Sequence, residues 1–77
     1  MSRITPVHWK VLVCIFEKAG FIFDRQKGSH MVFSKKGIWR PVVIPRYSQI
    51  DDDIIINLIH TAKIDRPVYF RYLAACK

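Results

Sequence analysis

The fold is decided by residues 21–34, which read FIFDRQKGSHMVFS. From residue 21 to residue 27 the pattern has a period of two, which is typical of a β-strand. Gly28-Ser29 interrupts the pattern, because both residue types favour turns. A second apolar-rich strand follows at residues 30–34. The stretch therefore predicts two consecutive strands of a meander sheet.

The period of two also predicts how the first strand is buried. Side chains two residues apart point to the same face of a strand. Phe21 and Phe23 would therefore share a face with Arg25 and Lys27. We expect a strand that is buried at its start and exposed toward its end.

A third strand is expected at residues 38–44, ending at Pro45. Lys35-Lys36-Gly37 predicts the turn before it, since glycine can adopt a positive φ. Pro41 lies inside the expected strand, and proline removes a backbone donor from the hydrogen-bond ladder. The position therefore predicts an edge strand or a bulge.

A helix is expected before these strands. Thr5 can cap it, Pro6 suits the first helical position, and Gly20 can end it after Ala19. Spacings of three and four place one group of apolar side chains on a buried face, namely Leu12, Ile15, Phe16 and Ala19.

Two helices are expected after the third strand. Asp51-Asp52-Asp53 supplies an N-cap and favourable negative charge at the start of the first of them. Its core stripe consists of Ile55, Leu58, Ile59 and Ala62. The last helix begins near Asp65-Arg66-Pro67 and buries some of Tyr69, Phe70 and Leu73. The order α-β-β-β-α-α predicts a single α+β domain over residues 1–77, with helices covering one face of a three-stranded antiparallel sheet.

The charge of the chain is unevenly distributed. The formal net charge of the 77 residues is +7. Six basic residues follow one another with no Asp or Glu among them: Arg25, Lys27, Lys35, Lys36, Arg40 and Arg46. Such a segment attracts polyanions, RNA and DNA above all. Solubility charge alone is the other interpretation of the same pattern.

Cysteine usage and hydropathy indicate the cytoplasm. Cys14 and Cys76 make neither a disulfide framework nor a zinc pattern. We expect Cys14 to be buried and reduced, and Cys76 to lie in a frayed terminus. The longest apolar run, residues 11–16, is too short to span a membrane or to form a signal-peptide core.

Among three histidines, His30 has the most suggestive surroundings. His8 and His60 are expected on helix faces, whereas His30 follows Gly28-Ser29 at a strand entrance inside the basic segment. RNA is cut when one group removes the 2′-hydroxyl proton and another protonates the leaving oxygen. Histidine suits both tasks, because an unperturbed imidazole has a pKa of about 6.5. A histidine that only hydrogen-bonds across the sheet is the alternative. No phosphate loop, metal-ligand spacing or nucleophile elbow is present, so no metal or cofactor is expected.

The chain resembles the HicA (YcfA-like) toxin family. The resemblance is carried by Glu17-Lys18-Ala19-Gly20-Phe21, by the run RQKGSH at residues 25–30, by Phe33, and by Val43-Ile44-Pro45-Arg46. It extends over roughly residues 6–73.

The resemblance implies a fold similar to double-stranded RNA-binding domains and an mRNA interferase activity. The histidine of the family's GSH motif is catalytic, and that position is His30 here. It also implies a HicB-type antitoxin that covers this histidine. Together with the basic segment it predicts an RNA-binding set of Arg25, Lys27, Ser29, Lys35, Lys36, Arg40 and Arg46.

Two positions depart from the family's pattern. Tyr47 stands where the family often has a histidine, and Asp51-Asp52-Asp53 stands where a double-stranded RNA-binding domain usually presents lysines. Carboxylates there would repel phosphates. The sequence therefore favours single-stranded RNA that approaches the sheet near His30.

Two other functions fit the sequence. A non-catalytic RNA-binding module predicts salt-sensitive binding without cleavage. A protein-interaction domain predicts an acidic partner on the basic surface, with RNA irrelevant.

Overall fold

The computed structural model describes residues 3–76, and its elements follow the predicted order α-β-β-β-α-α. The elements are α1 (Trp9–Lys18), β1 (Ile22–Lys27), β2 (His30–Ser34), β3 (Val42–Pro45), α2 (Asp52–Thr61) and α3 (Arg66–Cys76). The strands form one antiparallel sheet in the order β1-β2-β3. The predicted α+β class and the three-stranded meander are therefore confirmed.

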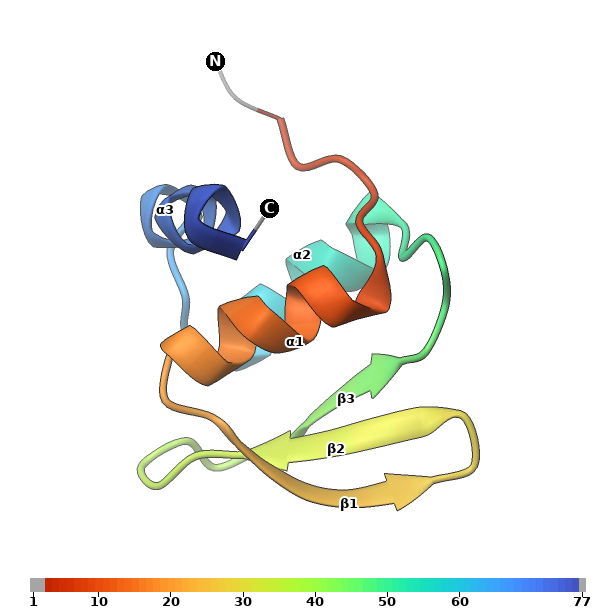
Figure 1. The fold of residues 1–77 in the computed structure, drawn as a ribbon. Helices are drawn as coiled ribbons and strands as arrows, with labels where there is room; N and C mark the ends of the chain where they lie inside the picture. Colours follow the sequence, from red (N-terminus) through yellow and green to blue (C-terminus); the bar gives the residue numbers. More distant parts are fainter. Residues whose placement is uncertain (1–2, 77) are drawn as a thin grey trace.

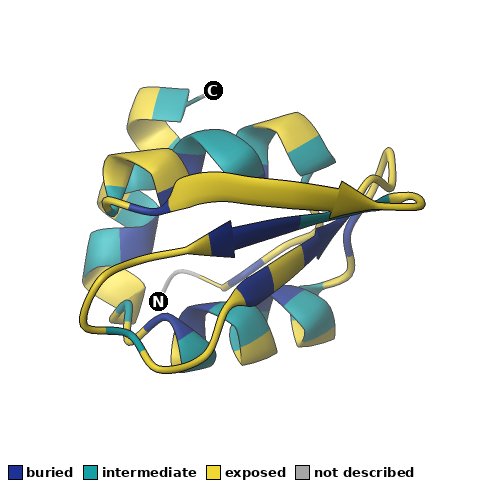
Figure 2. Cartoon of the chain, turned by 90° about the horizontal axis from the view of Figure 1, so that it is seen from below, coloured by how far each residue is buried: buried dark blue, intermediate teal, exposed yellow. Residues whose placement is uncertain are grey.

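Helices α1 and α2 lie on one side of the sheet, and α3 packs against α1 (Figure 1). The core between these layers contains Phe33, Val42 and Ile44 from the sheet, each at most 1% exposed. Figure 2 shows the sheet from its other side, where β1 is exposed along its whole length. No helix within residues 3–76 is long and apolar enough to cross a membrane.

Helix α1 begins at Trp9, so the predicted start at Thr5 and Pro6 is wrong. Val7 instead forms an antiparallel bridge with Ile50, with N···O distances of 3.2 and 2.7 Å. This long-range pairing keeps the backbone extended up to the helix. His8 then occupies the N-cap position, where its Nδ1 accepts a hydrogen bond from the backbone N–H of residue 10 at 3.1 Å.

The predicted core face of α1 is confirmed for three of its four residues. Leu12, Ile15 and Phe16 are fully buried, and Ala19 is half-buried at the C-cap. The spacing of three and four therefore predicted the correct face, although the helix begins later than expected.

Strand β1 contains a bulge. Phe23 pairs with Phe33, but Arg25 pairs with Val32, so two steps along β1 match one step along β2. Asp24 is the extra residue, as in a β-bulge.

The bulge reverses the faces of the second half of β1. The prediction that Arg25 and Lys27 share a face with Phe21 and Phe23 is therefore wrong. Phe21 is 3% exposed, in the core under the helices. The extra residue places both cations on the side of the sheet away from the helices.

Strand β3 is shorter than expected, and residues 38–41 precede it as a loop. Gly37 has a φ of 91°, and the N–H of Ile38 donates to the carbonyl of Lys35 at 3.0 Å, which closes the predicted turn. Pro41 lies just before the first strand residue and therefore removes no donor from the ladder. The expectation of an edge strand is confirmed, since β3 pairs with β2 alone.

Helix α2 follows the predicted start and stripe. Asp51 occupies the N-cap position, although its side chain makes no capping hydrogen bond. Ile55, Ile59 and Ala62 are buried, and Leu58 is half-buried.

Tyr69 anchors helix α3 in the core, where it is 0% exposed. Its backbone N–H donates to the carbonyl of Asp65 at 2.8 Å. Within residues 3–76 its hydroxyl has no hydrogen-bond partner, and burial raises the pKa of this phenol above its ordinary value. Phe70 and Leu73 are half-buried, as predicted.

Cys14 and Cys76 form a disulfide that joins α1 to the end of α3, with Cα atoms 5.9 Å apart. The prediction of a reduced Cys14 and a frayed Cys76 is therefore wrong. The two residues are 62 positions apart, and only the packing of α3 against α1 brings them together. In the chain-entropy model, a crosslink across so long a segment stabilises the fold by restricting the unfolded chain.

Candidate functional site

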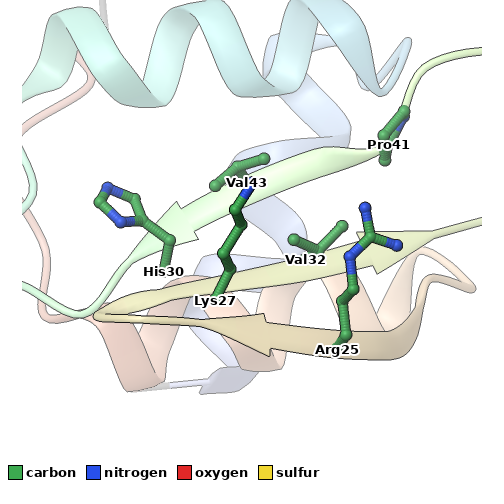
Figure 3. A pocket seen from close by; sticks show the side chains of 6 residues that line it. All are labelled: Arg25, Lys27, His30, Val32, Pro41 and Val43. Atoms are coloured by element: carbon green, nitrogen blue, oxygen red, sulfur yellow. The ribbon is translucent and has the colours of Figure 1, made fainter.

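A groove of about 430 Å³ lies on the side of the sheet away from the helices. Its lining residues come from all three strands and the loop before β3: Arg25, Lys27, His30, Val32, Pro41 and Val43. Figure 3 shows the side chains from β1 and β2 pointing to the same side of the sheet. The groove thus combines an apolar floor with two cations and one imidazole.

His30 stands at one end of this groove, as the first residue of β2. The sheet register pairs it with Lys27 on β1 and with Pro45 on β3. Cβ atoms of directly paired residues lie about 4.5–5.5 Å apart, so the side chains of Lys27 and His30 leave the sheet next to each other. Gly28, at a φ of 62°, permits the short turn that creates this pairing.

The imidazole of His30 is half-buried and open to a ligand. Within residues 3–76, neither of its nitrogens has a hydrogen-bond partner. This distinguishes it from His8, whose Nδ1 is used as a helix cap. An unengaged imidazole can accept or donate a proton to a bound substrate.

The segment after β3 is held against His30 by its backbone. The N–H of Arg46 donates to the carbonyl of Ser29 at 2.9 Å. The next residue, Tyr47, lies beside the imidazole, with ring centroids 6.5 Å apart. The sequence singles out Tyr47 as a departure from the family's pattern but does not place it beside His30. The signal for it was the alignment of β2 with β3, which places the end of β3 beside the start of β2.

The predicted basic residues divide between the groove and other places. Arg25 and Lys27 line the groove, and Arg46 and Ser29 lie next to it. Arg40 is exposed in the loop before β3, beside the groove residue Pro41.

Two predicted RNA-binding lysines are not brought together with His30. Lys35 and Lys36 follow the last residue of β2, whereas His30 is the first. The Nζ of Lys35 donates to the carbonyl of Ala19 at 2.7 Å, at the end of α1. Lys35 therefore satisfies a helix C-terminus, where a cation is favourable.

The groove is electrostatically positive. No carboxylate is among its lining residues. Asp24, the bulge residue, pairs with Arg25 at 3.1 Å, but both side chains are well exposed, at 45% and 65%. An exposed pair of this kind is weak, so Arg25 can exchange it for a phosphate. The three aspartates at residues 51–53 lie at the start of α2 instead.

Residues 3–76 contain no cluster of three or more His, Cys, Asp or Glu side chains arranged to hold a metal ion. The groove is lined by one imidazole and two cationic side chains, those of His30, Arg25 and Lys27.

The family model for the HicA toxin of bacterial toxin-antitoxin systems matches residues 9–64, more than half of the chain. The chain belongs to the HicA toxin family. Comparison with curated proteins and with solved structures gave no match. Membership of the HicA family makes the chain a toxin of a toxin–antitoxin system and implies an antitoxin partner.

The matched region of this HicA chain contains the whole groove, from Arg25 to Val43, and also Tyr47. Helix α3 and Cys76 lie beyond it. The family therefore accounts for the sheet and its first two helices, and the crosslinked last helix lies outside the match.

Proposed function

We propose that this HicA chain is an mRNA interferase, a ribonuclease that cuts single-stranded RNA without a metal ion. The observation that supports this most is the position of His30. Its unengaged imidazole stands at the end of a carboxylate-free basic groove, directly across from Lys27.

The proposed reaction is an attack of the RNA on itself. The 2′-oxygen forms a bond to the adjacent phosphorus, the bond from phosphorus to the 5′-oxygen breaks, and the products are a 2′,3′-cyclic phosphate and a 5′-hydroxyl. His30 either takes the 2′-hydroxyl proton or gives a proton to the leaving oxygen. Water completes the pair of proton transfers.

Arg25 and Lys27 have an electrostatic part in this reaction. Negative charge builds up on the phosphoryl oxygens in the transition state, and nearby cations stabilise it. Lys27 is closest to His30 in the register, and Arg25 lies two residues away along the same face of β1. Arg40 and Arg46 extend the positive surface at the two ends of β3.

Single-stranded RNA is the substrate that fits the groove. Unpaired RNA can lay its backbone along a row of cations and turn its bases toward apolar and aromatic side chains. Val32 and Val43 form such an apolar floor. The aspartates at residues 51–53 disfavour the binding of duplex phosphates by the start of α2.

A cleavage assay tests the proposal. A long unstructured RNA is incubated with the protein in excess chelator, and products are followed over time. His30→Ala should slow cleavage by about 10²–10⁴-fold, the usual contribution of a general acid or base. His60→Ala is the matched control, because His60 is an exposed histidine on α2 that does not line this groove.

Other outcomes of this assay would contradict the proposal. Cleavage that stops with chelator would assign the reaction to a metal ion. Equal cleavage by the protein and by His30→Ala would assign it to another residue. Salt-sensitive binding without cleavage by any variant would leave a non-catalytic RNA-binding module.

We also propose that a HicB-type antitoxin neutralises the chain by covering the groove. An acidic partner surface would complement Arg25 and Lys27 and exclude RNA from His30. Competition between antitoxin and RNA for the free toxin tests this. Simultaneous binding of both would rule it out.

A further inference from the structure

An exposed aromatic ring lies next to His30. Tyr47 is 47% exposed, and its ring centroid is 6.5 Å from that of His30, with the two planes inclined by 70°. The edge-to-face arrangement leaves much of the phenol ring open to solvent. A phosphate that contacts the imidazole would therefore carry its nucleoside close to this ring.

The backbone of Tyr47 is fixed from two directions. Its carbonyl accepts a hydrogen bond from the N–H of Trp9 at 3.1 Å, at the first residue of α1. The preceding residue, Arg46, donates its N–H to Ser29 in the turn before His30, at 2.9 Å. A ring on a backbone held in this way loses little conformational freedom when it binds a ligand.

Arg46 adds a cation directly before Tyr47 in the chain. Its guanidinium lies 4.6 Å from the centroid of the Trp9 ring, a cation–π contact that holds it beside Tyr47 in the chain. Tyr47 thus has the imidazole of His30 beside its ring and a cationic residue directly before it in the chain. Aromatic rings alternating with cations are how proteins bind single-stranded nucleic acid.

Other exposed aromatic side chains do not share this position. Trp39 is 95% exposed but lies in the loop before β3, whereas His30 pairs with the last residue of that strand. Phe23 is 46% exposed, and its ring already packs edge to face on Phe33. Tyr47 is therefore placed to contact the nucleotide that would react at His30.

We propose that Tyr47 is a base-stacking residue that holds the nucleobase next to the phosphate at His30. The inference rests on RNA being the ligand, as in the proposed function, and adds where one of its bases lies. RNA carries both a phosphate for the cations and the imidazole and a base that an exposed aromatic ring can stack, and no carboxylate lines the groove. Tyr47 is then a positioning residue, and the stacked face of its ring is the part that matters.

The test is a thermodynamic cycle with two uncleavable ligands. One is a fluorescein-labelled RNA of about a dozen nucleotides, mixed in sequence and 2′-O-methylated throughout, so that the attacking hydroxyl is absent. The other is an abasic ribose-phosphate chain of the same length, 2′-O-methylated in the same way. Dissociation constants are measured for the natural protein and for Tyr47→Leu, Tyr47→Phe and Trp39→Leu.

Tyr47→Leu should weaken binding of the RNA by about 5- to 150-fold, the range that corresponds to losing one stacked base. The same variant should bind the abasic chain as the natural protein does, because that chain has no base to stack. Tyr47→Phe, which keeps the ring, should bind the RNA normally. Trp39→Leu, the matched loss of an exposed aromatic at the other end of β3, should leave the affinity unchanged.

Three results would overturn the inference. Equal weakening of both ligands by Tyr47→Leu would mean a general effect on the groove. A loss in Tyr47→Phe as large as in Tyr47→Leu would assign the contact to the hydroxyl. Unchanged RNA affinity with weaker binding to a HicB-type antitoxin would make Tyr47 a protein-interface residue.

These outcomes are independent of the proposed cleavage. If the protein binds the RNA through Tyr47 but never cuts cleavable RNA, the stacking inference stands and the proposed ribonuclease activity is wrong. If the protein cuts RNA through His30 and its RNA affinity does not depend on Tyr47, the ribonuclease proposal stands and the stacking inference is wrong.

Discussion

The groove side of the sheet and the layer formed by α1 and α3 differ in how far their side chains are exposed and engaged. In the groove, Lys27, His30 and Tyr47 keep their functional groups exposed or unengaged, and short turns and backbone hydrogen bonds set their positions. Between α1 and α3 the side chains are buried or crosslinked, as with Tyr69 and the disulfide to Cys76. We expect stability to depend mainly on the layer of α1 and α3 and the proposed chemistry on the groove, so substitutions should affect one property at a time.

The largest expected effect comes from the core beneath the sheet. Phe33→Ala should lower the free energy of unfolding by about 3–5 kcal/mol, because Phe33 is 1% exposed and its removal leaves a cavity. Val43→Ala is the control on the groove side, where the residue is 40% exposed, and should cost about 1 kcal/mol or less. Urea unfolding measures both, and similar losses would contradict the division into two regions.

The disulfide should give the next largest effect. Reduction of the Cys14–Cys76 bond should lower the free energy of unfolding by about 2–4 kcal/mol, because the unfolded chain regains entropy. RNA affinity of the folded, reduced protein should stay the same, since the groove lies on the other side of the sheet. A reduced protein that is folded but no longer binds RNA would show that the two regions are coupled.

A smaller effect is expected within the basic surface. Lys27→Gln should make the dependence of log affinity for single-stranded RNA on log salt concentration shallower by about 0.7, the share of one phosphate contact. Lys36→Gln is the matched control, because Lys36 is exposed at the opposite end of β2 from His30. Equal slopes for the two variants would place the RNA away from the groove.

The smallest effect is expected at Tyr69. Tyr69→Phe should raise the free energy of unfolding by about 1 kcal/mol, because it removes a buried hydroxyl without a partner among the described residues. The raised pKa of Tyr69 means that the folded state keeps this proton longer than the unfolded state does. Below pH 10.0, the ordinary value, the phenol is protonated in both states and its ionisation does not lower the free energy of unfolding. As the pH rises above 10.0, the unfolded chain loses the proton more readily, and the free energy of unfolding of the natural protein falls.

This pH dependence gives the prediction a second measurement. The stability advantage of Tyr69→Phe over the natural protein should widen as the pH rises above 10.0. Unfolding of the two proteins at neutral and alkaline pH measures the difference. A constant difference across this range would mean that the phenol does not ionise differently in the two states.

Local sequence determined which segments became helices and strands. The period of two before Gly28-Ser29, the strand at residues 30–34 and the apolar stripe of α2 all rest on residues a few positions apart. Backbone preferences and hydrophobic periodicity act over that distance, so helices and strands of this kind can be inferred from the sequence before the tertiary structure is known. The place of His30, at a strand entrance inside a basic segment, was determined in the same way.

Tertiary structure decided which of these segments meet and which faces they present. Asp24 is a bulge in the pairing of β1 with β2, which turns Arg25 to the side of the sheet away from the helices, and the period of two did not reveal it. The Nζ of Lys35 donates to the carbonyl of Ala19 at the end of α1, a contact between residues 16 positions apart.

The two contacts that most change the functional interpretation are also long-range. The pairing of β3 with β2 places the ring of Tyr47 beside that of His30. Cys14 and Cys76, 62 positions apart in the chain, form a disulfide. Such contacts depend on the packing of distant segments into one core, where burial and backbone hydrogen bonding must be satisfied together. Neighbours in the chain do not contain that information, and only the folded molecule does.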